Sequence, residues 1–166
     1  MGSALTRRAV ADRFLSLPGV IGRMGGVHGG FLRVPVLWTD DLATGIEKID
    51  EAHRELFQRV SGLHDAMRAG ELGEIPRLVT YLQRYALDHF AAEEREMVAT
   101  GYPAIGQHRR HHQQFVEEFV RHKALLEAEV TPSAVVALSR WITDWLHNHV
   151  RKVDGDLARW LRQPRR

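Results

Sequence analysis

Seven side chains of the types that bind metal ions lie in order along the chain. They are five histidines and two carboxylates: His53, His89, Glu93, His108, His112, His149 and Asp154. Imidazole nitrogen and carboxylate oxygen are good ligands for iron, although manganese, zinc or cobalt also accept them. A redox metal that keeps one coordination position open can bind a small molecule such as O₂ there.

Four helices are the elements that must position these side chains. Apolar residues and the candidate ligands recur together at steps of three and four. Pro76 suits the first turn of a second helix, Gly101 ends it, and Pro132 marks the start of the fourth. No stretch alternates as a strand would. The sequence therefore predicts an all-α, antiparallel up-down four-helix bundle with short connections.

The order of the seven residues brings them to one level of such a bundle. His53 lies near the start of the first helix, whereas His89 and Glu93 lie near the end of the second. The third helix carries its pair near its start, and the fourth carries its pair toward its end. Because neighbouring helices run in opposite directions, these positions meet at the same end. We therefore expect a di-metal site inside one end of the bundle.

Spacing within each helix decides which ligands share a face. The pairs His89/Glu93 and His108/His112 are four residues apart, which places both members on one side of a helix. His149 and Asp154 are five residues apart, and an ideal α-helix would point these two side chains apart. The sequence therefore predicts a local widening of the fourth helix between them.

The number of donors matches two six-coordinate ions with one vacancy. Five imidazoles give five contacts, two bridging carboxylates give four, and a bridging oxygen from solvent gives two more. One ion would hold three histidines and be filled, whereas the other would hold two and stay open. Apolar residues within a turn of the ligands predict a dry pocket, which favours reversible binding over oxidation chemistry. The residues expected to line this pocket are Phe90, Met97, Trp145, Leu146 and Val150.

Composition narrows the classes of protein. The chain has 166 residues, 44% of them hydrophobic, which suffices for one domain with a core. There is no cysteine, so disulfides, iron–sulfur clusters and thiolate zinc sites are excluded. Residues 1–39 and 159–166 together carry +8, so residues 40–158 carry −6, and we expect no nucleic-acid partner. No apolar run reaches the length of about 18 residues that a membrane span needs.

The N-terminal region contains a short apolar stretch, Phe14 to Gly22, after three arginines. It is similar to the apolar part of an export signal, but Ser16, Pro18 and Gly19 interrupt it and no small-residue cleavage site follows. We therefore expect a cytoplasmic protein. Met24 offers an alternative start of the chain.

Four segments of the chain resemble the hemerythrin family, and single-domain bacterial hemerythrins in particular. They are Gly45-Ile46 to His53, His89-Phe90-Ala91-Ala92-Glu93-Glu94, His108 to Phe115, and Trp145-Leu146 to Asp154. The resemblance divides the chain into a basic, flexible extension (1–35), a hemerythrin-like bundle (36–160) and a basic tail (161–166). It does not explain residues 1–35, and Val150 stands where isoleucine is usual in the family.

The resemblance implies a non-haem centre of two Fe ions, joined by an oxo or hydroxo bridge, that binds O₂ reversibly. The function implied is oxygen carriage, storage or delivery, and not enzymatic turnover. The filled iron would be held by His108, His112 and His149. The open iron would be held by His53 and His89. Glu93 and Asp154 would bridge. Further expected partners are NO as a small ligand and a reductase or an O₂-consuming enzyme.

Other interpretations compete with an oxygen carrier. A single inward histidine is usually a core residue, but seven candidate ligands at one level argue against that for the set. A di-iron oxidase or peroxidase-like enzyme would use Glu-x-x-His on two helices, a pattern absent from this sequence. A metal-buffering, zinc-structural or oxygen-sensing bundle is a third alternative.

Several residues near the candidate ligands are expected to do something else. Asp50 is expected to be an acid that favours the first turn of a helix, and not a hydrogen-bond partner of a ligand histidine. Glu94 is expected to be solvated, and His111 and His147 to lie on the surface.

Overall fold

In the computed structural model, residues 37–163 are described, and every regular element among them is helical. The long helices are α2 (Glu47–Arg68), α3 (Ile75–Thr100), α4 (Ile105–Ala128) and α5 (Pro132–His149). The short elements are the 3-10 turns η1 (Asp40–Leu42) and η2 (Leu72–Glu74), the π-helical segment η3 (Val150–Asp154) and α6 (Gly155–Leu161). The all-α class predicted from the sequence is confirmed.

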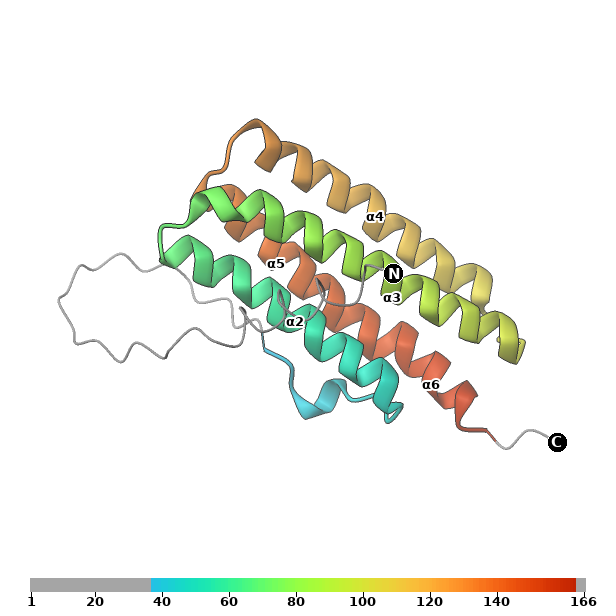
Figure 1. Cartoon of the computed structure of the whole chain (residues 1–166). Helices are drawn as coiled ribbons and strands as arrows, with labels where there is room; N and C mark the ends of the chain where they lie inside the picture. The colour runs from blue at the N-terminus through green and yellow to red at the C-terminus, as the bar shows by residue number, and fades with distance from the viewer. Residues whose placement is uncertain (1–36, 164–166) are drawn as a thin grey trace, which may run out of the picture. The chain divides into compact units, whose positions relative to one another are not determined.

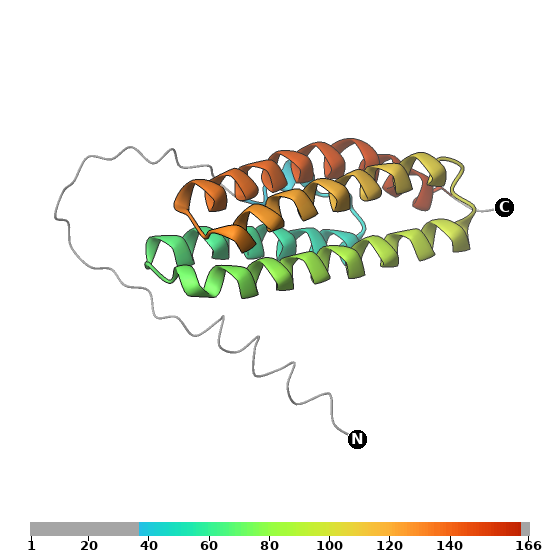
Figure 2. The same cartoon turned by 90° about the horizontal axis from the view of Figure 1, so that it is seen from above.

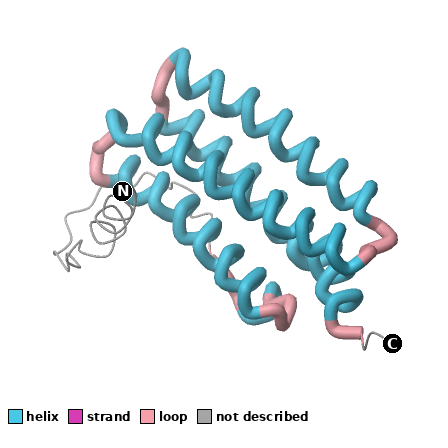
Figure 3. The backbone as a smooth tube through the Cα atoms, turned by 45° about the vertical axis from the view of Figure 1, so that its right-hand side comes forward, coloured by secondary structure: helices cyan, strands magenta, loops and turns pink. Residues whose placement is uncertain are grey.

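The four long helices run alternately up and down beside one another (Figures 1 and 2). α2 packs against α3 and α5, and α4 packs against the same two helices, so chain neighbours are also neighbours in space. The connections between the long helices are short loops at the two ends (Figure 3). This is the predicted antiparallel up-down bundle.

The helix boundaries follow local signals in the sequence. Pro76 occupies the first turn of α3, where its missing N–H costs no hydrogen bond. Gly101 ends α3 with φ of 67°, a left-handed conformation that glycine adopts without strain. Thr131 caps α5, because its hydroxyl accepts a hydrogen bond from the Ala134 N–H at 3.2 Å.

Asp50 holds the loop that leads into α2. Its carboxylate accepts bonds from the Thr44 N–H at 2.7 Å, the Thr44 hydroxyl at 2.7 Å and the Gly45 N–H at 3.1 Å. The expectation of an acid in the first turn is confirmed, and among the described contacts Asp50 makes no hydrogen bond to a histidine. Asp50 therefore fixes the start of the helix that carries His53.

Replacing Asp50 with alanine is expected to lower the free energy of unfolding by about 3 kcal/mol, because bonds to a buried charge are among the stronger ones in proteins. Urea denaturation of the metal-free protein measures this change. The control is Glu51→Ala, which removes an exposed acid one residue away. Equal unfolding midpoints for the two variants would contradict this role of Asp50.

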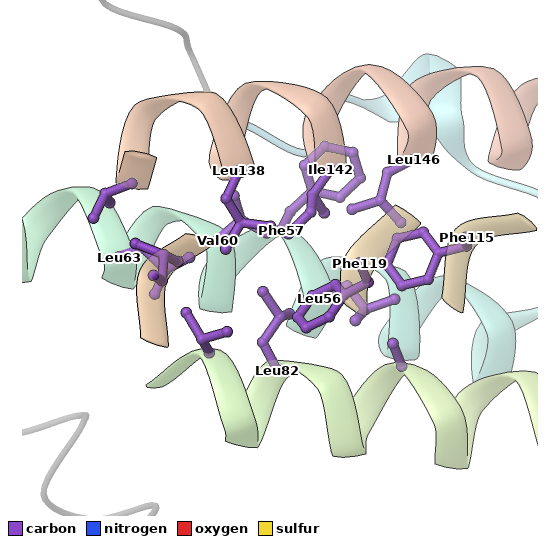
Figure 4. Packing of buried hydrophobic residues seen from close by; sticks show 14 of the residues in the cluster. Leu56, Phe57, Val60, Leu63, Leu82, Phe115, Phe119, Leu138, Ile142 and Leu146 are labelled. Atoms are coloured by element: carbon purple, nitrogen blue, oxygen red, sulfur yellow. The ribbon is translucent and has the colours of Figure 1, made fainter. Parts of the chain in front are cut away.

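Apolar side chains fill most of the bundle interior. Figure 4 shows this core, in which Leu56, Phe57 and Val60 of α2 face side chains from the other three long helices. A second, smaller cluster joins Ile49, Met97, Tyr102 and Leu157.

The candidate ligands occupy the level between these two apolar clusters. Along α2, His53 lies one turn after Ile49 of the small cluster and one turn before Leu56 of the main core. Along α3, Glu93 likewise lies between Phe90 and Met97. The candidate site is therefore a polar layer with apolar packing on both sides.

Some expectations fall outside the described residues. They are the flexible extension 1–35, including the apolar stretch from Phe14 and the alternative start at Met24, and positions 164–166 of the basic tail. Within the described part, α6 continues to Leu161, and Arg162 donates a hydrogen bond to the Thr44 carbonyl. None of the described helices is long and apolar enough to cross a membrane.

Candidate metal centre

All seven candidate ligands are buried at the same end of the bundle, and none is more than 7% exposed. α2 supplies one of them, α3 and α4 two each, and the last two come from the end of α5 and from η3. Their polar atoms approach one another within hydrogen-bond or ion-pair distance. The predicted convergence of these side chains is therefore present in the structure.

The π-helical segment η3 allows His149 and Asp154, which are five residues apart, to point in the same direction. α5 ends at His149, and the chain then runs through the wider π-helix until Asp154. This widening lets residues five apart point the same way, so His149 Nε2 lies 3.1 Å from Asp154 Oδ1. The predicted distortion between the two residues is confirmed.

Glu93 faces two groups of histidines with its two oxygens. Oε1 lies 3.4 Å from His89 Nε2 and 3.9 Å from His53 Nε2. Oε2 lies 3.2 Å from His112 Nε2 and 3.6 Å from His108 Nε2. One carboxylate thus serves both groups at once.

Asp154 repeats this arrangement from the other side. Its Oδ2 lies 3.1 Å from His53 Nε2, whereas its Oδ1 lies 3.3 Å from His108 Nε2 and 3.1 Å from His149 Nε2. The residues accordingly fall into two sets that could each hold an ion. One is Glu93 with His108, His112 and His149, and the other is Glu93 with His53 and His89.

Hydrogen bonds within the protein do not satisfy this cluster. Both oxygens of Glu93, both oxygens of Asp154, and Nε2 of His53 and of His149 are buried without a hydrogen-bond partner among residues 37–163. Buried polar atoms normally have partners, and leaving them unpaired is costly. The donor set of imidazoles and carboxylates therefore fits two ions of the iron type, which would accept these lone pairs.

Electrostatics keep the two carboxylates ionised. Burial raises the pKa of Glu93, but the surrounding histidines outweigh burial and lower the pKa to about 2. The same competition lowers the pKa of Asp154 well below its usual value. For His108, burial lowers the pKa, but the nearby carboxylates of Asp154 and Glu93 prevail and raise it to about 9. In the metal-free protein a protonated His108 would balance part of the negative charge of the carboxylates, and a metal ion would displace that proton.

Aromatic rings stack closely on two of the candidate ligands, His112 and His149. Phe90 stacks on His112, with ring centroids 4.0 Å apart, and Trp145 stacks on His149 at 4.2 Å. Leu146 and Val150 are buried in the main core, whereas Met97 belongs to the small cluster on the other side of the polar layer. The five residues predicted to line a ligand pocket thus lie on both sides of the site.

Glu94 has a role that the sequence did not suggest. Its Oε1 accepts a hydrogen bond from His112 Nδ1 at 3.1 Å, and its Oε2 accepts one from Arg109 Nε at 2.9 Å. The side chain is 29% exposed, so it is partly solvated as expected, but it also bonds to the His112 ring. A carboxylate bonded to Nδ1 orients the imidazole so that Nε2 points at the site. One feature of the sequence could have predicted this role: Glu94 is an acid directly after Glu93, at the level of Arg109 on the next helix.

The Glu94→Ala variant is expected to bind iron about 10- to 100-fold more weakly, since the His112 ring loses the bond that orients it. Titration against a competing iron chelator measures the affinity. Glu117→Ala serves as the control, because Glu117 is an exposed acid of the same charge on α4. An unchanged affinity in the Glu94 variant would show that His112 is oriented by packing alone.

Three further aromatic side chains lie close to the candidate ligands or to the core beside them. His111 and His147, expected on the surface, are half-buried, because their rings lie near His149 and Phe57 at centroid distances of 5.9 and 5.2 Å. Trp38 packs against the core, and its ring also lies over His53, with ring centroids 6.1 Å apart.

Fold and site together define a four-helix-bundle protein whose buried histidines and carboxylates could hold a pair of metal ions. Residues 44–161 match the family described as Hemerythrin HHE cation binding domain. The chain belongs to the hemerythrin family.

Individual relatives agree with this assignment. Bacteriohemerythrin of Pseudomonas aeruginosa is 34% identical over 122 residues, which is 72% of this chain and 77% of the relative. Myohemerythrin of Theromyzon tessulatum is 30% identical over 120 residues, covering 72% of this chain and 88% of the relative. A crystal structure of wild-type hemerythrin matches with a TM-score of 0.69 at 29% identity, covering 76% of this chain and 98% of that one.

Proposed function

We propose that this protein binds O₂ reversibly at a pair of iron ions and serves to carry, store or deliver it. The observation that supports this most is the arrangement of Glu93 and Asp154. Each presents one oxygen to His53 or His89, and the other to the set of His108, His112 and His149. Two carboxylates in that position can bridge two ions.

The proposed division of ligands follows the same geometry. His108, His112 and His149 would hold one ion with all of its positions filled. His53 and His89 would hold the other, which keeps a position for O₂. If both positions hold iron(II), each ion would supply one of the two electrons that reversible binding of O₂ at the pair requires.

The residues around the site would keep O₂ binding reversible by excluding water and protons. Phe90, Leu146 and Val150 are buried on the core side of the polar layer, and Met97 is buried on the other side. A dry surrounding removes the proton source that release of reduced oxygen species needs. We therefore propose a carrier and not an enzyme, with NO as a second small ligand.

Visible spectroscopy tests the proposal. The reduced, iron-loaded protein should be nearly colourless, gain a charge-transfer band on exposure to O₂, and lose it again when O₂ is removed, over several cycles. Irreversible oxidation in the first cycle together with sustained consumption of hydrogen peroxide would favour the peroxidase-like alternative. One zinc ion per chain in protein from unsupplemented cells would favour a structural metal site.

The proposed carrier would work in the cytoplasm and would meet a reductase that returns oxidised iron to iron(II), or an enzyme that consumes the delivered O₂. Cell fractionation tests the location. Recovery of the protein outside the cytoplasmic fraction would overturn that part of the proposal and leave the O₂-binding part unaffected.

A further inference from the structure

A cleft of about 580 Å³ opens beside the candidate metal centre, between the start of α2, the second half of α3 and the end of α6. Glu93 and His89 form part of its lining. His89 is also the most exposed of the seven candidate ligands, at 7% against 3% or less for the others. The cleft is therefore the side from which solvent comes nearest to the site.

The rim of the cleft is acidic. Asp88, Ala92 and Glu96 follow one another at steps of four on α3, so they share one face, and Lys48 of α2 lies on the opposite side. Neither Asp88 nor Glu96 forms an ion pair within the described part of the chain, and both are exposed. Two carboxylates against one ammonium group leave a net charge of −1 at the rim, which attracts cations.

Glu93 connects this rim to the interior. Its carboxylate lines the cleft, is almost completely buried, and has no hydrogen-bond partner on either oxygen in the described part of the chain. A cation drawn to the rim would thus meet the carboxylate of Glu93 and, one helical turn away on α3, the imidazole of His89.

Aromatic side chains lie against three of the other candidate ligands. Trp38 lies over His53, Phe90 stacks on His112, and Trp145 stacks on His149. The lining of the cleft, by contrast, includes the small side chains of Ala52 on α2 and Ala92 on α3.

We propose that this cleft is the route by which iron(II) reaches its site in the metal-free protein. Asp88 and Glu96 attract the cation at the surface, and His89 with Glu93 receive it. The inference rests on the proposed function in one respect, that iron is the metal bound. The charge of the rim acts on a cation and would not act on neutral O₂.

The first test follows metal uptake by stopped flow. Metal-free protein is mixed anaerobically with iron(II) or with cobalt(II), and quenching of tryptophan fluorescence reports loading, since Trp145 stacks on His149. The Asp88→Asn/Glu96→Gln variant should load about tenfold more slowly at low ionic strength. At about 1 M salt the difference should disappear, because the Debye length falls to about 3 Å. Asp144→Asn/Glu129→Gln removes two exposed acids elsewhere and should load like the unmodified protein.

The second test narrows the cleft. Ala92→Leu should slow loading at every ionic strength, and it should also slow removal of iron from the loaded protein by a chelator. Lys48→Gln should speed loading at low salt. Circular dichroism and the final metal content should match the unmodified protein in each case, which separates a slower route from a damaged fold.

Loading and removal rates that are unchanged in all three variants, with two ions still bound at the end, would overturn the route. That result leaves O₂ binding untouched. Conversely, the variants could show the predicted changes in loading rate while the protein takes up two ions but binds no O₂. That result would overturn the proposed function and support the route.

Discussion

The Glu93→Gln variant is expected to lose both iron ions, whereas His53→Leu is expected to keep one. Glu93 faces His53 and His89 with one oxygen and His108 and His112 with the other, so its removal weakens both positions. His53 contacts the carboxylates on one side only. Loss of an orienting neighbour alone costs about 10- to 100-fold in metal affinity, and loss of a bridging ligand should cost more.

Iron content per chain after dialysis against a weak chelator measures this difference. Glutamine preserves the shape of the side chain, and circular dichroism checks that both variants are folded. The assignment of Glu93 as a bridge would be wrong if its variant retained one tightly bound ion. Equal loss of both ions from the His53 variant would argue against the division of histidines between the two positions.

Removal of iron is expected to lower the melting temperature by at least about 8 °C. A ligand present at about 1,000 times its Kd stabilises the folded state by about 4 kcal/mol, and a domain of this size shifts by about 2–4 °C per kcal/mol. The structural reason is the set of buried oxygens and nitrogens of Glu93, Asp154, His53 and His149 that have no hydrogen-bond partner among the residues that the structure describes. Two ions would satisfy them together.

Thermal melting with and without a chelator measures the shift. The Glu93→Gln variant is the matched control, since it should melt at one temperature under both conditions. Identical melting of the iron-loaded and iron-free forms of the unmodified protein would mean that the buried polar layer is stable by itself.

The fold and the convergence of the seven residues could be predicted from the sequence because both depend on periodicity. Steps of three and four fix which face of a helix is inward, and alternating helix direction fixes the level at which His53, Glu93 and His149 meet. Even the π-helix was predictable, because five residues between His149 and Asp154 do not fit an α-helical face.

Features that depend on the exact rotation of neighbouring helices could not be predicted. The bond between Glu94 and His112 requires the outer edge of α3 to meet α4 in one particular register. The cleft depends on the sizes and directions of the side chains that α2, α3 and α6 contribute to its lining. Neither the hydrogen bond nor the cleft can be read from the hydrophobic pattern of the sequence, because the side chains concerned lie at the boundary between core and surface.

The amount of O₂ bound per iron tests the central claim most directly. Reduced protein with a known iron content is titrated anaerobically with O₂, and uptake is compared with the amounts of iron and of chain. A bridged pair with one open position predicts two irons per chain, one O₂ for every two irons, and full release under vacuum. A protein that carries two irons per chain and takes up no O₂, or takes up one O₂ for each iron, would contradict it.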